Sequence, residues 1–184
     1  LSNIQSKSFE LSLLLSVPAS FGLIIASEEI VNALFGYGSF NKEDVQSTAD
    51  ALKYFAYGVP AFALVKILSN FFFARDNTKT PFYISTAMVI INISISVSLF
   101  SSFGFIIIPI ATSISTWTGV LIYIYLLNEK NFLLLNKKLI PNFIKILAST
   151  IIMSIIMVLL INNYESYLNY SYKFKAIYLL SIVG

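Results

Sequence analysis

One long uncharged stretch limits the fold of this chain more than any other feature. From Phe82 to Asn128 the sequence contains no Asp, Glu, Lys or Arg. A single helix of that length would measure about 70 Å at ~1.5 Å per residue, whereas the hydrocarbon core of a bilayer is ~30 Å thick. The stretch must therefore fold back once, and the sequence "SSFG", Ser101 to Gly104, is the natural place for the turn. We expect two membrane spans, near residues 82 to 100 and 105 to 127.

Composition agrees with a membrane protein and excludes most enzyme chemistry. Of the 184 residues, 57% are hydrophobic and 11% are charged, against roughly 25% charged residues in an average soluble domain. The chain has no Cys and no His, which removes disulfides, thiolate nucleophiles, the commonest metal ligand and the usual general base. The net charge of +3 is a mild excess, of the kind that membrane proteins carry mostly in cytoplasmic loops. We therefore predict no enzyme, no cofactor, no metal site and no nucleic-acid partner.

The same length criterion predicts about six spans in all. The last begins near Phe174, but "FKAIYLLSIVG" supplies about eleven residues where a span needs about 20. Together with Leu at position 1, this truncated run indicates a piece of a longer protein. The other expected spans run from about 10 to 27 with a bend at Pro18, from about Leu52 to Phe73 with a kink at "YGVP" (Tyr57 to Pro60), and from about Phe143 to Ile161.

A polar connection joins the first two spans. The sequence "EEIVNALFGYGSFNKED" predicts a short interfacial helix followed by a glycine turn. Asn41 then has the residue type of a helix N-cap, and Asp44 stands at the third helical position. We expect the helix that starts here to run straight into the second span.

One segment allows a different interpretation. "INISISVS", Ile91 to Ser98, alternates apolar and polar residues with period two, as a lipid-facing strand of a β-barrel does. The flanking runs do not alternate, so a helix is favoured. On a helix, Asn92 and Ser96 are neighbours at i and i+4 and can face another helix. The predicted fold class is all-α, a polytopic bundle of transmembrane helices.

The distribution of charge between the connections predicts the orientation. Cytoplasmic connections of membrane proteins are enriched in Lys and Arg. Basic and non-basic connections alternate along this chain, as successive crossings require. The N-terminal end with Lys7 is therefore expected in the cytoplasm, and the segment from 28 to 50 and "SSFG" outside. The basic connections hold Arg75 and Lys79, and then Lys130, Lys137 and Lys138, while the first connection holds Glu28, Glu29, Glu43, Asp44 and Asp50.

Lys66 is the only ionisable residue well inside a predicted span. Burying it costs roughly 2.5 to 3.5 kcal/mol on insertion scales unless it finds a partner or water. It lies about 13 Å along the helix from Arg75, too far for full snorkelling. Ser69 and Asn70, at i+3 and i+4, extend a polar stripe that should face the bundle interior or a wet cavity. Two roles remain open: a hydrogen bond to a neighbouring helix, or a place along a substrate path.

The fourth span carries a small, weakly polar face. Thr112, Ser115, Thr116 and Gly119 follow the spacing i, i+3, i+4 and i+7. Close packing against another helix is favoured over the lining of a polar ligand site.

Three motifs follow one another between residues 34 and 81. They are "LFGYGSF", then "ADALKYFAYGVPAFALVKILSNFF", then a loop of the form "A.D...TP". In this order they resemble the MurJ/MviN family of lipid II flippases, within a superfamily that includes oligosaccharide-lipid and multidrug exporters. The chain departs from the family at "GYG", Gly36 to Gly38, where many relatives carry a charged pair before the glycine.

The loop motif is the strongest part of this resemblance. Arg75 and Lys79 place it in the cytoplasm by charge, and Asp76 and Thr78 can cap backbone groups before Pro81, at an early helical position, opens the next span. The loop signature comprises Ala74, Arg75, Asp76, Thr78, Lys79, Thr80 and Pro81.

The resemblance implies a fold and a function. The chain would hold the last six of about fourteen helices of a MATE-like transporter with two lobes. Residues 1 to 128 would belong to the second lobe, with about four spans, and residues 129 to 184 would be an incomplete C-terminal pair that helps form a groove for a lipid tail. Alternating access would carry lipid II, or a related polyprenyl-pyrophosphate-linked saccharide, across the bacterial inner membrane. Lys66 matches the family's lysine in its helix.

The partners implied are this lipid substrate, the surrounding membrane lipids and the missing N-terminal part of the same protein. Two alternatives stay open. An exporter of the same fold could carry another polyprenyl-linked oligosaccharide or hydrophobic cations, and intramembrane Asp or Glu upstream of Leu1 would favour the cation exporter. A membrane scaffold without transport would have upstream spans that lack ionisable residues.

Overall fold

The computed structural model describes residues 2–36, 38–130, 132 and 139–167. Regular structure in this part of the chain is helical. The helices are α1 (Ser2–Ile25), α2 (Ser27–Phe35), α3 (Lys42–Ala56), α4 (Val59–Phe73), α5 (Lys79–Phe103), the 3-10 turn η1 (Gly104–Ile106), α6 (Ile107–Glu129) and α7 (Leu139–Tyr167).

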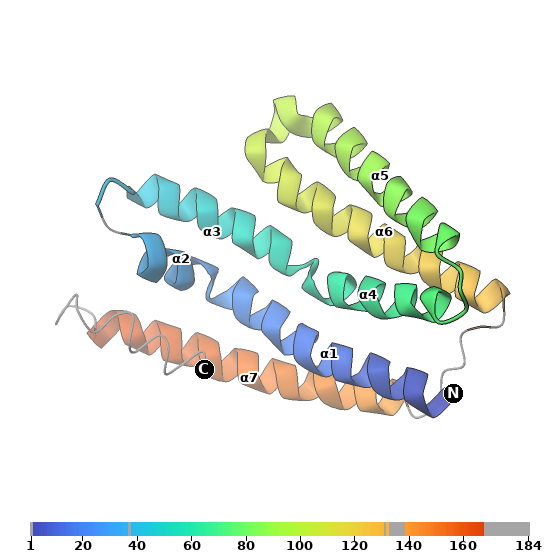
Figure 1. Ribbon diagram of the computed structural model, residues 1–184. Coiled ribbons are helices and arrows are strands. Elements are labelled where there is room, and N and C mark those ends of the chain that lie inside the picture. Colours follow the sequence, from blue (N-terminus) through green and yellow to red (C-terminus); the bar gives the residue numbers. More distant parts are fainter. Residues whose placement is uncertain (1, 37, 131, 133–138, 168–184) are drawn as a thin grey trace.

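The helices form a row (Figure 1). Within it α4 runs opposite to α1, and α5 runs opposite to α6, whereas α7 runs in the same direction as α1, and α6 in the same direction as α4. Across the row the order is α7, α1, the α3–α4 pair, α6 and α5, and each helix contacts the next. One apolar core runs through the row, and α1, α4 and α6 supply most of it. Its most completely buried large side chains include Leu68 and Phe72 of α4 and Tyr123 and Leu127 of α6. The central helix α4 is therefore packed between α1 and α6.

The predicted spans are largely confirmed. Among the residues that the structure describes, four stretches are long and apolar enough to cross a membrane: Ile4–Ile25, Lys42–Phe73, Lys79–Glu129 and Leu139–Asn162. The third folds back at Gly104, whose φ of 63° lies in the region that favours glycine, into the antiparallel pair α5 and α6. The first span begins nearer the N-terminus than predicted, and its helix continues through Pro18. The predicted sixth span, from about Phe174, lies outside the described residues.

The segment Ile91 to Ser98 is helical and lies within α5. The Asn92 side-chain amide donates a hydrogen bond of 2.9 Å to the Thr112 hydroxyl of α6. The prediction that Asn92 faces another helix is confirmed. The Ser96 hydroxyl is buried as well, but it has no hydrogen-bond partner in the structure. Gly119 of α6 lies against the Met88 side chain of α5, so the small face of α6 serves close helix packing.

The polar connection between the first spans also follows the prediction. Helix α2 is the expected short helix, and the capping box at the start of α3 is complete: the Asp44 N–H donates to Asn41 Oδ1 at 2.9 Å, and the Asn41 N–H donates to Asp44 Oδ2 at 3.0 Å. The two positions of "GYG" favour glycine for different structural reasons. A Cβ on Gly36 would clash with the Asn32 backbone carbonyl, and Gly38 has a φ of 72°.

The helix that begins after Asn41 continues into the second span as predicted, and this span is broken at "YGVP", where a kink was expected. Helix α3 ends at Ala56 and α4 begins at Val59, so "YGVP" separates two helices. Pro60 has no N–H to donate to the Ala56 carbonyl, and the Gly58 N–H donates to Phe55 instead of Tyr54. The break thus removes helical partners from the carbonyls of Tyr54 and Ala56.

Neighbouring helices supply hydrogen bonds to the carbonyls at this break. The Ser20 hydroxyl of α1 donates to the Ala56 carbonyl at 2.6 Å, and the Ser113 hydroxyl of α6 donates to the Tyr54 carbonyl at 2.6 Å. Trp117 of α6 donates its indole N–H to the Tyr57 carbonyl at 3.0 Å. The break is therefore bound from both sides of the row.

Removing one of these donors should destabilise the bundle. Ser113 is 7% exposed, so Ser113→Ala leaves a buried carbonyl without a partner, which costs about 1 to 3 kcal/mol. We expect a lower midpoint of detergent-induced unfolding for the full-length protein. Thr118→Val is the matched control on the same helix, because the Thr118 hydroxyl donates within α6, to Ile114. Equal unfolding midpoints for the two variants would contradict this role of Ser113.

Candidate functional site

Helix α4 ends in a Schellman motif, and the loop to α5 begins there. The Asn77 N–H donates to the Phe72 carbonyl at 3.1 Å, and the Asp76 N–H donates to the Phe73 carbonyl at 3.0 Å. Asp76 occupies the position where glycine is usual, with a φ of 54°. Asp and Asn are the residues other than glycine that adopt this conformation most readily.

Asn77, rather than Asp76 or Thr78, caps the next helix. Its side-chain Oδ1 accepts from the Thr80 N–H at 3.1 Å, and its amide donates to the Thr80 hydroxyl at 3.0 Å. Thr78 precedes the first helical residue but makes no capping hydrogen bond through its side chain. The predicted capping roles of Asp76 and Thr78 were wrong because Asp76 is used to end α4, which moves the capping position along the chain. Pro81 lies in the first turn of α5, as predicted.

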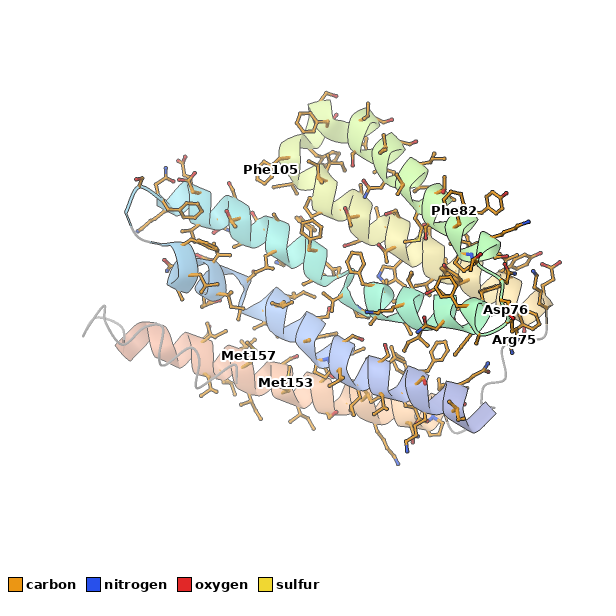
Figure 2. The ribbon with its side chains drawn as sticks, viewed as in Figure 1. Arg75, Asp76, Phe82, Phe105, Met153 and Met157 are labelled. Carbon is orange, nitrogen blue, oxygen red and sulfur yellow. The ribbon has the colours of Figure 1, made fainter. Side chains whose placement is uncertain are left out.

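Arg75 joins this loop to the end of α6. Its guanidinium donates to the Phe71 carbonyl at 2.7 Å and lies 4.2 Å from the centre of the Phe132 ring. The Phe132 ring also packs edge-on against Phe72, and the Gln5 side-chain amide donates to the Phe132 carbonyl at 3.0 Å. Figure 2 shows Arg75 and Asp76 near one end of the helices, and Phe105 near the opposite end, where α5 turns into α6. The loop signature therefore includes a cluster that ties together α1, α4 and the residues after α6.

The predicted substrate-path residues lie on one exposed side of α4. Lys66 and Asn70 are exposed, and Phe62 and Phe73, which are 42% and 47% exposed, lie on the same side. Ser69 donates its hydroxyl to the Lys66 carbonyl at 2.9 Å, so its hydrogen bond is within the helix. The core side of α4, with Leu64 and Leu68, is opposite. The polar stripe therefore faces away from the described helices, because the apolar face of α4 is used for packing. Of the two surroundings expected for it, the interior of these helices is excluded, and a wet cavity stays a prediction.

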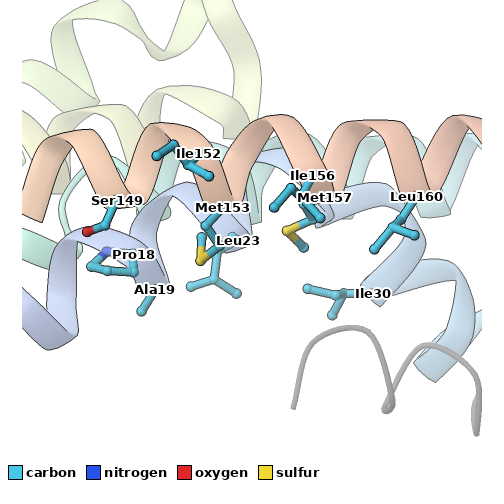
Figure 3. A pocket seen from close by; sticks show the side chains of 11 residues that line it. Pro18, Ala19, Leu23, Ile30, Ser149, Ile152, Met153, Ile156, Met157 and Leu160 are labelled. Carbon is cyan, nitrogen blue, oxygen red and sulfur yellow. The ribbon is translucent and has the colours of Figure 1, made fainter.

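A groove between α1 and α7 has a different character (Figure 3). It encloses about 740 Å³, and Leu23 of α1 and Met153 of α7 face its space. Ser149 is the polar side chain among those that line it. The resemblance implied a groove formed with the C-terminal pair, but the sequence did not indicate which residues would line it, because neither helix has a pattern that reveals its partner. The lining residues are Pro18, Ala19, Gly22, Leu23, Ile30, Ser149, Ile152, Met153, Ile156, Met157 and Leu160.

The conformation of Asp76 yields a direct test of the loop. Asp76→Val should lower the free energy of unfolding by about 1 to 2 kcal/mol, because a β-branched residue is strained at positive φ. Asp76→Gly should cost much less, and Asp76→Asn should resemble the native protein. Thermal unfolding of the purified full-length variants measures their order of stability. If the valine variant were as stable as the glycine variant, this backbone assignment would be wrong.

Comparisons with known proteins agree with the fold and the motifs. Residues 1–179 match the protein family "Lipid II flippase MurJ". The "Probable lipid II flippase MurJ" of Rickettsia prowazekii is 40% identical over 171 residues, which are 92% of this chain and 33% of that protein. The protein of the same name from Rhizobium meliloti is 35% identical over 120 residues, which are 65% of this chain and 22% of that protein. The chain thus spans a third or less of the length of these relatives.

A solved structure has the same arrangement of helices. The "Lipid II flippase MurJ, inward closed conformation" matches with a TM-score of 0.79, at 24% identity, over 99% of this chain and 36% of that chain. At this identity the likeness shows the fold. The match to the family, however, covers nearly the whole sequence. The chain therefore belongs to the MurJ family of lipid II flippases.

Proposed function

We propose that this chain is the C-terminal part of a flippase that moves lipid II across the bacterial inner membrane by alternating access. The observation that carries the proposal is the groove between α1 and α7. Its volume of about 740 Å³ lies within the ~300 to 1,000 Å³ that is usual for ligand sites. A polyprenyl chain is an apolar, branched occupant that such a groove would suit.

The lining of the groove fits a tail and not a headgroup. Met153 and Met157 are unbranched and polarizable, so they adapt to an irregular apolar ligand. A pyrophosphate there would lose its hydration with little in return, since the polar group at hand is the neutral Ser149 hydroxyl. The headgroup would therefore need another place, with cations.

The division of the chain follows from this assignment. Residues 1 to 128 would belong to the second lobe of the transporter. Residues 129 to 184 would be the additional C-terminal pair, of which α7 closes the groove against α1. The packing of α7 at the end of the row, next to α1, supports this division. The upstream part of the same protein would supply the first lobe.

The exposed polar stripe on α4 would contact the headgroup of the lipid. A Lys ammonium is a compact charge that binds phosphate without a fixed geometry. Lys66 and Asn70 lie on the side of α4 that the described helices leave uncovered. We assign this stripe to the cavity between the two lobes, where Lys66 would offset the charge of the pyrophosphate. The loop with Arg75 would lie at the cytoplasmic end.

Filling the groove tests the function. A Cβ on Gly22 would meet no atom within 4 Å, so Gly22→Trp can place an indole in the groove without disturbing the packing of α1. In cells depleted of their own flippase, the full-length native protein should restore growth and the arrival of lipid II at the outer leaflet. The tryptophan variant should fail to do so at equal membrane levels.

Two controls separate groove filling from other effects. Gly22→Ala adds a methyl group and should retain transport. Leu15→Trp places the same bulk on a 74% exposed position of α1 that does not line the groove, and should also retain transport. Normal growth with Gly22→Trp would reject the groove as the tail site, and failure of the native protein to restore growth would reject the proposed function.

Lys66 yields a separate prediction. Because a charge-assisted hydrogen bond is worth about 1.5 to 3 kcal/mol, Lys66→Met should lower the rate of lipid II flipping about tenfold or more. Lys66→Arg, which keeps the charge, should retain part of the rate. Lys53→Met is the control, since Lys53 is an exposed lysine on α3. Flipping is measured with the full-length protein in vesicles. An unchanged rate in Lys66→Met and Lys66→Ala at normal protein levels would leave Lys66 a structural role only.

A further inference from the structure

A second hollow lies at the end of the α1–α7 seam where both helices begin. It encloses about 250 Å³ and, unlike the apolar groove, it is lined by charged side chains from both helices. The residues that line it are Lys7, Glu10, Leu11 and Leu14 of α1 and Asn142, Lys145 and Ile146 of α7. Of the described residues, the roles assigned above to the loop, to the α4 stripe and to the groove use none of these.

The hollow and the apolar groove lie along the same side of the seam. On α1, Leu14 precedes Pro18 of the groove by four residues, and on α7, Ile146 precedes Ser149 by three. These spacings place each pair on one helix face, one turn apart. The hollow is thus a polar site that continues into apolar surface. Leu11 and Leu14, at 51% and 48% exposed, form its wall on that side.

The charges in the hollow are of both signs. Lys7 and Lys145 are exposed and supply two ammonium groups. The Glu10 carboxylate accepts a hydrogen bond of 2.8 Å from the Asn142 side-chain amide, which fixes the carboxylate across the helix interface. A carboxylate has two oxygens, so Glu10 can accept from a further donor as well.

The depth of the site matches the headgroup region. Lys7 lies five residues after the first residue of α1, and Lys145 lies six residues after the first residue of α7, about 8 and 9 Å along each axis. Lysine side chains at such depths reach the membrane surface and keep their stems in apolar surroundings. Basic pockets between transmembrane helices are typical places for lipid headgroups.

We propose that this hollow binds the phosphoethanolamine headgroup of a zwitterionic phospholipid. The phosphate lies between Lys7 and Lys145, the ammonium group donates to Glu10, and an acyl chain follows Leu11 and Leu14. A purely acidic headgroup would place its phosphate beside the Glu10 carboxylate without an ammonium group to offset the repulsion. The inference rests on the two helices crossing a membrane, and is independent of which substrate the protein carries.

The test compares lipids that differ at the headgroup alone. Full-length protein is stripped of lipid in detergent and titrated with phosphatidylethanolamine, phosphatidylcholine or phosphatidylglycerol of identical acyl chains, and bound lipid is counted by native mass spectrometry. Phosphatidylcholine has the same charges as phosphatidylethanolamine, but its ammonium carries methyl groups and no N–H donor. We expect phosphatidylethanolamine to bind about two- to fivefold more tightly than either of the others, as for a partly exposed ion pair.

Variants assign the preference to the hollow. Glu10→Gln keeps an oxygen for Asn142 but loses the charge, so the preference for phosphatidylethanolamine over phosphatidylcholine should disappear. The double variant Lys7→Met and Lys145→Met should weaken the binding of all three lipids. Lys79→Met, a lysine outside the hollow at the start of α5, should change the binding of none of them.

Three results would overturn the proposal. They are equal binding of phosphatidylethanolamine and phosphatidylcholine to the native protein, tighter binding of phosphatidylglycerol than of phosphatidylethanolamine, and a preference that survives in Glu10→Gln. The first comparison needs no variant, so it stands even where a substitution lowers the yield of folded protein.

Discussion

The need to satisfy every backbone carbonyl and amide without water governs this structure. In the hydrocarbon region an unpaired peptide group has no solvent to bond, so an irregular backbone survives there only where protein groups take over. The break at "YGVP" obeys this rule: Ser20 from one neighbour and Ser113 and Trp117 from the other donate to its carbonyls. These donors require α3–α4 to have a neighbouring helix on each side, and the row places it between α1 and α6.

Hydropathy and local rules predicted the elements well. The turn near Gly104 followed from helix length against bilayer thickness, and the capping box of Asn41 and Asp44 followed from residue types at a fixed spacing. Both depend on interactions within a few residues or on the solvent. The predicted capping by Asp76 and Thr78 failed by one residue, because the sequence does not reveal that an Asp will take the positive-φ place at the end of α4.

Interactions between helices were less accessible from the sequence. The polar residues of α5 and α6 indicated that Asn92 would meet another helix, but not that Thr112 would be its acceptor. The side to which Lys66 points depends on which face of α4 packs, and the apolar residues Leu64, Leu68 and Phe72 decide that. The α1–α7 groove arises from two segments more than a hundred residues apart, as the Asn142 to Glu10 hydrogen bond between them illustrates.

The exposed sides of α4 and α5 differ in chemistry, and this difference bears on what each side contacts. The outward side of α5 carries apolar groups such as Ile90, Ile93 and Val97, which are suited to lipid or to an apolar protein surface. On α4, Phe62 and Phe73 share their side with Lys66 and Asn70, and a lysine facing lipid at that depth would be costly. A mixed face of this kind is stable where aromatic rings contact protein and the ammonium group reaches water. The same physical requirement that binds the "YGVP" break to its neighbours therefore agrees with the proposed hydrated cavity on the Lys66 side of α4, and with apolar contacts on the α5 side.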